Sequence, residues 1–318
     1  MDISYNWLKD LVNTAITAAE VAAELTRVGL AVEGIHPHGD DLVLDIDLTS
    51  NRPDCLSHLG VARELAVSQR LDIAIGNSNA QNDADPDLVS IVDPDLCHRF
   101  TARIIRGVKI GPSPQWLVDR LEAIGERSIN NVADITNYVM HELGQPMHSF
   151  DLDKLAEGRI VVRKARAGET ITTLDEVDRK LDESMLAICD ADKPVAVGGV
   201  MGGLESSITD STVNVLLEVA YFDRVNIRAT SRKLNLATEA SYRFERGVDI
   251  ENLIRASNRA SQLISKLAGG SLGDFIDVYP APFIPKTVES QNISSAVKRL
   301  TGLTVEADEC VRILSALG

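Results

Sequence analysis

The chain has 318 residues, of which 44% are hydrophobic and 25% are charged, and its formal net charge is −15. This length predicts two or three domains with room for a sizeable core. The negative charge argues against a protein that coats nucleic acid by bulk electrostatics, so any RNA contact must be local. No apolar run approaches the roughly 20 residues needed to cross a bilayer, and the first residues lack the order of a secretory signal. We therefore expect a cytoplasmic protein.

Residues 1–78 predict a small helical module. Its second helix begins at Thr17, where Glu20 completes a capping box, and ends at Gly29. Residues 42–48 then alternate between apolar and polar side chains, as a half-buried strand does, and another helix follows. A single strand thus separates the predicted helices.

Cysteine and histidine form no recognisable metal-binding pattern. The four cysteines are scattered without a CxxC pair, which disfavours a zinc site and a disulfide framework, so we expect core or incidental thiols. His36, His38 and His58 have no carboxylate or cysteine partner in register, and we predict that they lie on the surface. We predict no metal ligands in this chain.

The rest of the chain predicts an α+β protein. Residues 79–90 are polar and acidic and are predicted to be a linker. From 91 to 279, compact helices mix with short, mostly antiparallel strands, unlike a doubly wound sheet. Residues 280–318 begin with a proline-rich linker, which contains Pro280, Pro282 and Pro285, and end with the start of a helical module. That module is too small to bury its own core, so we expect a truncated chain.

The stretch 195–249 holds most of the functional signal. Four glycines follow an apolar run within six residues, so the backbone there must bend, approach another group closely or adopt positive φ. The apolar run 213–222 carries one charge in its middle, Glu218. Burying this carboxylate is costly unless it meets a donor, which makes it a candidate for recognition or catalysis. The alternative is a strand carboxylate that reaches solvent.

Two further patterns in this stretch are ambiguous. The glycine-rich segment lacks the Lys and Ser/Thr of a nucleotide-binding loop, so its N–H groups are better suited to a carbonyl or a developing oxyanion. The window 224–246 contains six basic and two acidic residues, and is either a solvated helix face or a surface that contacts phosphates. Its candidate phosphate-binding residues are Arg228, Arg232, Lys233 and Arg243.

Several blocks resemble the β subunit of bacterial phenylalanyl-tRNA synthetase. The resemblance to the editing domain of that subunit lies in the blocks NVADITNYVMHELGQPMHSFD, AVGGVMGG, NVLLEVAYF and ATEASYRFERGVD. The resemblance to its N-terminal module lies in SYNWLKDLV, RVGLAVEGI and TSNRPDCLSHLGVARELA. The similarity covers essentially the whole chain. That family usually inserts a tRNA-binding OB-fold near the equivalent of residues 36–41, where this chain has only a short connection. The insert was lost naturally or was removed by engineering.

The resemblance implies an editing hydrolase that removes tyrosine wrongly esterified to tRNA(Phe). By position, Glu218 would receive the tyrosine hydroxyl, and His148 would be the catalytic residue near the ester. The other implied substrate-binding residues are Thr136, Asn137, Gly198, Gly199, Gly202, Thr238 and Ala240. The basic residues of the window 224–246 would contact tRNA.

The resemblance also implies partners. In the family, the amino acid is activated on the α subunit with ATP and magnesium, within a heterotetramer of two α and two β subunits. This chain has no ATP-binding signature, so we expect no cofactor, no aminoacylation and no binding to DNA or membranes. Two alternatives remain open. One is a scaffold that docks the α subunit and keeps a vestigial editing site, and the other is a tRNA-binding module without chemistry.

Overall fold

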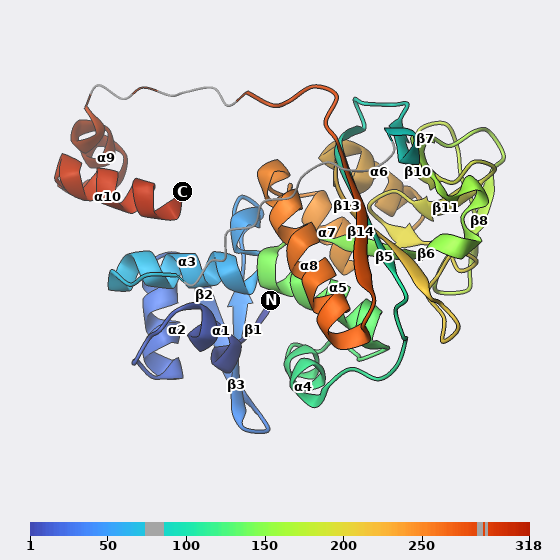
Figure 1. Cartoon of the computed structure of the whole chain (residues 1–318). Helices are drawn as coiled ribbons and strands as arrows, with labels where there is room; N and C mark the ends of the chain where they lie inside the picture. Colours follow the sequence, from blue (N-terminus) through green and yellow to red (C-terminus); the bar gives the residue numbers. More distant parts are fainter. Residues whose placement is uncertain (74–85, 285–288, 290–291) are drawn as a thin grey trace.

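The computed structural model describes residues 1–73, 86–284, 289 and 292–318. Residues 79–85 of the predicted linker, and Pro285, lie outside the described residues. The predicted α+β class is confirmed, since the described residues form helices together with four sheets whose strands pair mostly antiparallel (Figure 1). Among the described residues, no helix has both the length and the apolar character needed to cross a membrane.

The N-terminal module contains more strand than the sequence predicts. Three helices, α1 (Tyr5–Leu11), α2 (Ala18–Arg27) and α3 (His58–Gln69), pack with a sheet of order β1-β3-β2, formed by Asp2–Ser4, Asp41–Asp47 and Ala31–His38. The capping box of Thr17 and Glu20 is confirmed. Strands β2 and β3 form a hairpin, and only Gly39 and Asp40 of the predicted connection 36–41 lie between them. The strand β2 escaped prediction because its side chains are mostly exposed and do not alternate.

His58 is a core residue, so the prediction that it lies on the surface is wrong. Its side chain is fully buried, and its ring stacks on Trp7 with the ring centroids 3.8 Å apart. Its Nε2 accepts a hydrogen bond from the backbone N–H of Ser4, and its Nδ1 lies 3.1 Å from the carbonyl oxygen of His141. Burial lowers the pKa of His58 to about 3, so the imidazole is neutral and joins the N-terminal module to the next domain. His36 and His38 are exposed, as predicted.

The next domain is built around a four-stranded antiparallel sheet of order β14-β5-β13-β6. Its strands are β5 (Cys97–Arg106), β6 (Met147–Asp151), β13 (Asn214–Phe222) and β14 (Ser271–Val278). One face packs on α5 (Asn131–Leu143) and α8 (Leu253–Ala268), and α4 (Gln115–Ala123) packs on α5. Figure 1 shows these helices on one side of the sheet and a second sheet on the other.

The second sheet has five strands in the order β12-β11-β10-β7-β4. They are β4 (Val89–Ile91), β7 (Ile160–Lys164), β10 (Leu186–Cys189), β11 (Pro194–Val197) and β12 (Met201–Gly202). A small hairpin, β8 (Thr170–Thr172) and β9 (Asp178–Lys180), and two helices, α6 (Arg224–Lys233) and α7 (Glu239–Phe244), complete this side. The two sheets share one apolar core.

Strand alternation places Glu218 between the two sheets. Along β13, Val215, Leu217 and Val219 pack in the core formed with α5 and α8. The intervening residues Leu216 and Ala220 pack in the core shared with the five-stranded sheet. Because successive strand residues point to opposite faces, Glu218 points into the layer between the sheets.

The C-terminal segment ends in two helices, α9 (Ile293–Thr301) and α10 (Ala307–Leu317). Figure 1 shows α10 near α3, where Arg312 donates a hydrogen bond to the carbonyl oxygen of Val67. The four cysteines are free and buried, which confirms the expectation of core thiols.

Candidate functional site

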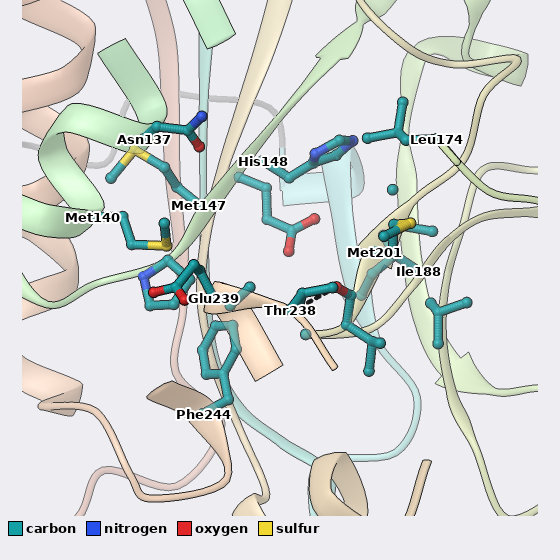
Figure 2. A pocket seen from close by; sticks show the side chains of 18 of the residues that line it. Asn137, Met140, Met147, His148, Leu174, Ile188, Met201, Thr238, Glu239 and Phe244 are labelled. Atoms are coloured by element: carbon teal, nitrogen blue, oxygen red, sulfur yellow. Dashed lines mark hydrogen bonds between the residues drawn. The ribbon is translucent and has the colours of Figure 1, made fainter. Parts of the chain in front are cut away.

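A cavity of about 320 Å³ lies where β6, β13, α5, α7 and the turn before β12 meet. Seven of the predicted site residues line it: Asn137, His148, Gly199, Gly202, Glu218, Thr238 and Ala240. Figure 2 shows Asn137, His148 and Thr238 around the same space. Much of the remaining wall is apolar and is formed by Met140, Met147, Leu174, Ile188, Val200, Met201 and Phe244. Residues from segments far apart in the sequence therefore form one cavity.

Glu218 and His148 are directly paired across β13 and β6. Glu218 is only 6% exposed, and its Oε2 is buried without a hydrogen-bond partner in the described structure. The Nε2 of His148 is likewise buried and unpartnered there. Buried polar atoms normally have partners, and an unpaired one costs about 1–3 kcal/mol. Both residues line the cavity, so a bound ligand is a physical explanation for this cost.

Burial sets the protonation state of both groups. It raises the pKa of Glu218 to about 8 and lowers the pKa of His148 to about 4, because each charged form is poorly solvated between the sheets. At neutral pH, the site therefore presents a protonated carboxyl group and a neutral imidazole. The carboxyl group can then both donate and accept a hydrogen bond.

The raised pKa of Glu218 predicts a specific pH dependence of stability. Between pH 4.5 and 8, the folded protein keeps a proton on Glu218 that the unfolded chain releases. The free energy of unfolding should therefore fall as pH rises through this window, by up to about 1.4 kcal/mol per pH unit. Denaturant unfolding at several pH values should show this loss in the wild type relative to Glu218→Gln. Any effect of His148 on stability is the same in both proteins. If the free energy of unfolding changes with pH in the same way in the wild type and in Glu218→Gln, Glu218 ionises freely in the folded protein.

Two glycines leave room for neighbouring side chains. A Cβ atom on Gly202 would lie 2.2 Å from Cε1 of His148, so the imidazole occupies the space that a larger residue would fill. Gly199 has φ +66°, and a Cβ atom there would lie 2.8 Å from Cδ1 of Ile227. Gly198 packs against Leu186, and its N–H donates to the carbonyl oxygen of Leu186 at 2.9 Å, so this amide is already occupied.

The helix α7 is fixed against the glycine turn by Thr238. This residue caps α7, because its Oγ1 accepts a hydrogen bond from the N–H of Ser241 at 3.0 Å. The same hydroxyl donates to the carbonyl oxygen of Val200 at 2.8 Å, as the dashed line in Figure 2 marks. Ala240 is consequently held at the cavity wall. Thr136 does not line the cavity, since it is buried in α5 and its hydroxyl donates to the carbonyl oxygen of Ala133.

Arg243 is not a surface residue, so the expectation that it contacts phosphate is wrong. It is 1% exposed, and its Nη1 donates to Oε2 of Glu239 at 2.6 Å. Its Nε donates to the carbonyl oxygen of Leu56 at 3.1 Å, and its Nη2 lies 3.2 Å from Nδ1 of His141. A buried guanidinium needs such partners, and two of these, Leu56 and His141, come from distant segments of the chain.

The other basic candidates lie on α6 and are exposed. They are Arg228, Arg232 and Lys233. Lys233 pairs with Asp182 at 2.6 Å. The sequence reading missed two carboxylates of the cavity wall, Glu126 and Glu239. Glu239 stands between Thr238 and Ala240 in the sequence, but no spacing pattern marked Glu126.

Comparison with known proteins shows the family to which this chain belongs. The model of the B3/4 domain matches residues 96–269, and the chain belongs to this family. Its relatives include phenylalanine–tRNA ligase β subunits, which confirms the resemblance drawn from the sequence. That of Carboxydothermus hydrogenoformans is 49% identical over 282 residues, covering 88% of this chain and 35% of that protein. That of Rhodopirellula baltica is 42% identical over 322 residues, covering 100% of this chain and 47% of that protein.

The chain thus spans about a third to a half of the length of these relatives. Among solved structures, an N-terminal fragment of the phenylalanyl-tRNA synthetase β-subunit from Pyrococcus horikoshii covers 100% of this chain and 88% of that chain. The TM-score is 0.47 and the sequence identity is 14%, so this likeness carries no argument about function.

Proposed function

We propose that the cavity hydrolyses the ester bond between tyrosine and tRNA(Phe), as an editing site of a phenylalanine–tRNA ligase β subunit. The observation that carries the proposal is a largely apolar cavity with a buried, unpartnered carboxyl group, that of Glu218. Such a space suits a phenol, whose ring is apolar and whose hydroxyl needs a hydrogen-bond partner. The similarity to phenylalanine–tRNA ligase β subunits supports tRNA(Phe) as the RNA part of this ester.

Discrimination against phenylalanine follows from the same carboxyl group. A bound phenylalanine side chain would leave Oε2 of Glu218 buried and unpaired, whereas the tyrosine hydroxyl would satisfy it. A site built to hydrogen-bond a substrate hydroxyl can reject the analogue that lacks it by roughly 10⁴–10⁵. An apolar pocket that selects phenylalanine for aminoacylation cannot reject the added hydroxyl of tyrosine as strongly. This explains the need for a second site.

His148 is the proposed catalytic residue. Its imidazole is neutral at pH 7, and its unpartnered Nε2 is free to accept a hydrogen bond from water. We assign it the role of positioning the attacking water beside the ester. The lowered pKa makes it a weak base, so most of the rate enhancement must come from orientation and from N–H groups of the turn at Gly199.

The direct test is the release of labelled tyrosine from mischarged tRNA(Phe). The purified chain should release it faster than buffer does, and His148→Ala should lose at least about tenfold of this rate because the water is no longer positioned. A chain that binds the mischarged tRNA without accelerating release would favour the scaffold or tRNA-binding alternatives.

We also propose that the chain works with an α subunit and tRNA(Phe), and that it does so in the cytoplasm, as its relatives imply. Amino-acid activation with ATP and magnesium would take place on the α subunit. The glycine turn of this chain does not fit a nucleotide, because the segment AVGGVMGG has no Lys, Ser or Thr side chain to hold the phosphates or a magnesium ion. No step of the proposed hydrolysis uses ATP or magnesium.

The exposed face of α6 is the proposed tRNA contact. Reversing Arg228 and Arg232 to Glu should weaken tRNA binding and reduce its salt dependence, by about 0.7–0.9 in the log–log slope for each lost phosphate contact. Hydrolysis of a short tyrosyl ester should stay nearly unchanged, because neither residue lines the cavity. Binding titrations across a salt series test this. Unchanged tRNA binding would make α6 a solvated helix face.

A further inference from the structure

The cavity has a second polar region, formed by Glu126 and Glu239. Each contributes a carboxylate oxygen to a cluster with His141 in which the polar atoms lie within 4.8 Å of one another. Two carboxylates so close together repel each other unless cations or hydrogen-bond donors lie between them. The part of the chain that the structure describes supplies only some of these donors.

Arg243 and His141 hold the two carboxylates in place. Arg243 donates from Nη1 to Oε2 of Glu239 at 2.6 Å and from Nη2 to Nδ1 of His141 at 3.2 Å. A guanidinium can only donate, so Nδ1 of His141 is the acceptor and Nε2 carries the proton. That Nε2 donates to Oε1 of Glu126 at 3.0 Å. The pKa of Glu126 is lowered, chiefly by this hydrogen bond, so the group is an anion at neutral pH.

The cluster carries one more negative than positive charge, and its carboxylates are open to solvent, since the side chains of Glu126 and Glu239 are 23% and 54% exposed. Burial, the main cause, lowers the pKa of His141, so His141 is neutral at pH 7. Two carboxylates then face a single guanidinium. Within the described residues, Oε2 of Glu126 and Oε1 of Glu239 have no hydrogen-bond donor. A monovalent cation with several N–H donors would satisfy both oxygens and balance the charge.

A divalent metal ion fits this cluster poorly. The only ring nitrogen of His141 that faces Glu126 carries a proton, so it has no lone pair for a metal. The guanidinium of Arg243 already lies against Glu239, and a metal ion there would be repelled by it.

We propose that Glu126 and Glu239 bind the α-ammonium group of the aminoacyl ester, with Arg243 and His141 as positioning residues. The inference rests on the proposed function, because an aminoacyl ester carries an ammonium group near its scissile bond. The unpartnered carboxyl group of Glu218 in the same cavity independently indicates that a ligand binds there. Together, the two polar regions would recognise the phenol and the ammonium group of one tyrosyl residue.

The test uses two small phenols, tyramine and 4-ethylphenol, which differ in the ammonium group. Calorimetric titration of the wild type should show tyramine binding at least tenfold more tightly than 4-ethylphenol. The double variant Glu126→Gln/Glu239→Gln should lose this advantage while its affinity for 4-ethylphenol stays the same. Glu245→Gln, at the end of α7 and outside the cavity lining, is the matched control and should behave as the wild type.

The other outcomes contradict the inference in distinguishable ways. Equal affinity of the wild type for both phenols, or an advantage for tyramine that survives in the double variant, would overturn the ammonium subsite. Displacement of tyramine by Mn²⁺, with Mn²⁺ binding lost in the double variant, would show a metal site instead. These titrations do not depend on hydrolysis. A protein that binds tyramine as expected but never releases tyrosine from tRNA would keep the inference and lose the proposed activity.

Discussion

Replacing Ala240 with Trp should abolish ester hydrolysis, by at least about 100-fold, without unfolding the protein. Ala240 is half-buried in the wall of a cavity of about 320 Å³. An indole ring at this position would occupy the space proposed for the tyrosine side chain. Because the ring enters an existing cavity rather than a packed core, the cost in stability should stay at or below the roughly 1–3 kcal/mol typical of overpacking.

The matched control for this variant is Ala23→Trp, at an exposed position of α2 outside the cavity and the proposed tRNA contact. Its hydrolysis rate and melting temperature should both stay near those of the wild type. The measurements are the initial rate of tyrosine release and the melting temperature for all three proteins. Full activity of Ala240→Trp would place the reaction outside this cavity.

Replacing Glu218 with Ala should remove the preference for tyrosine. The substrate hydroxyl would then be buried without its partner, which should cost roughly 1–3 kcal/mol, or about 5- to 150-fold in the ratio of kcat/KM for tyrosyl and phenylalanyl esters. Glu218→Gln should lose less, because an amide can still hydrogen-bond to the phenol.

The fold should tolerate the loss of Glu218, because Oε2 has no partner in the described structure and its burial is unfavourable. The melting temperature of Glu218→Ala should therefore be unchanged or higher. If the variant unfolds, Glu218 is a structural acid and its part in recognition must be given up.

Residue chemistry alone found the most informative position. Glu218 stood out because a single charge interrupts an apolar strand, and a charge there is costly to bury. His148, however, pairs with Glu218 across strands that lie 70 positions apart, and no local pattern reports that register. Only the resemblance to the β subunit predicted that His148 belongs to the site.

The wrong predictions share one physical cause. Arg243 and His58 are polar residues read from local sequence as surface groups, yet both are buried. Their partners come from distant segments: Arg243 donates to Leu56, and His58 lies against the carbonyl oxygen of His141. A local pattern cannot show whether such partners exist, so burial of polar groups was the part of the site that the sequence could not predict. Glu126 escaped notice for the same reason.

The central claim is that one cavity recognises the tyrosine hydroxyl and hydrolyses its ester. The most direct measurement compares, at neutral pH, the kcat/KM of the purified chain for tRNA(Phe) charged with tyrosine and with phenylalanine. The account predicts release of tyrosine with a preference of at least about 100-fold, which falls sharply in Glu218→Ala. Equal release of both amino acids by the wild type, or a preference unchanged in Glu218→Ala, would contradict it.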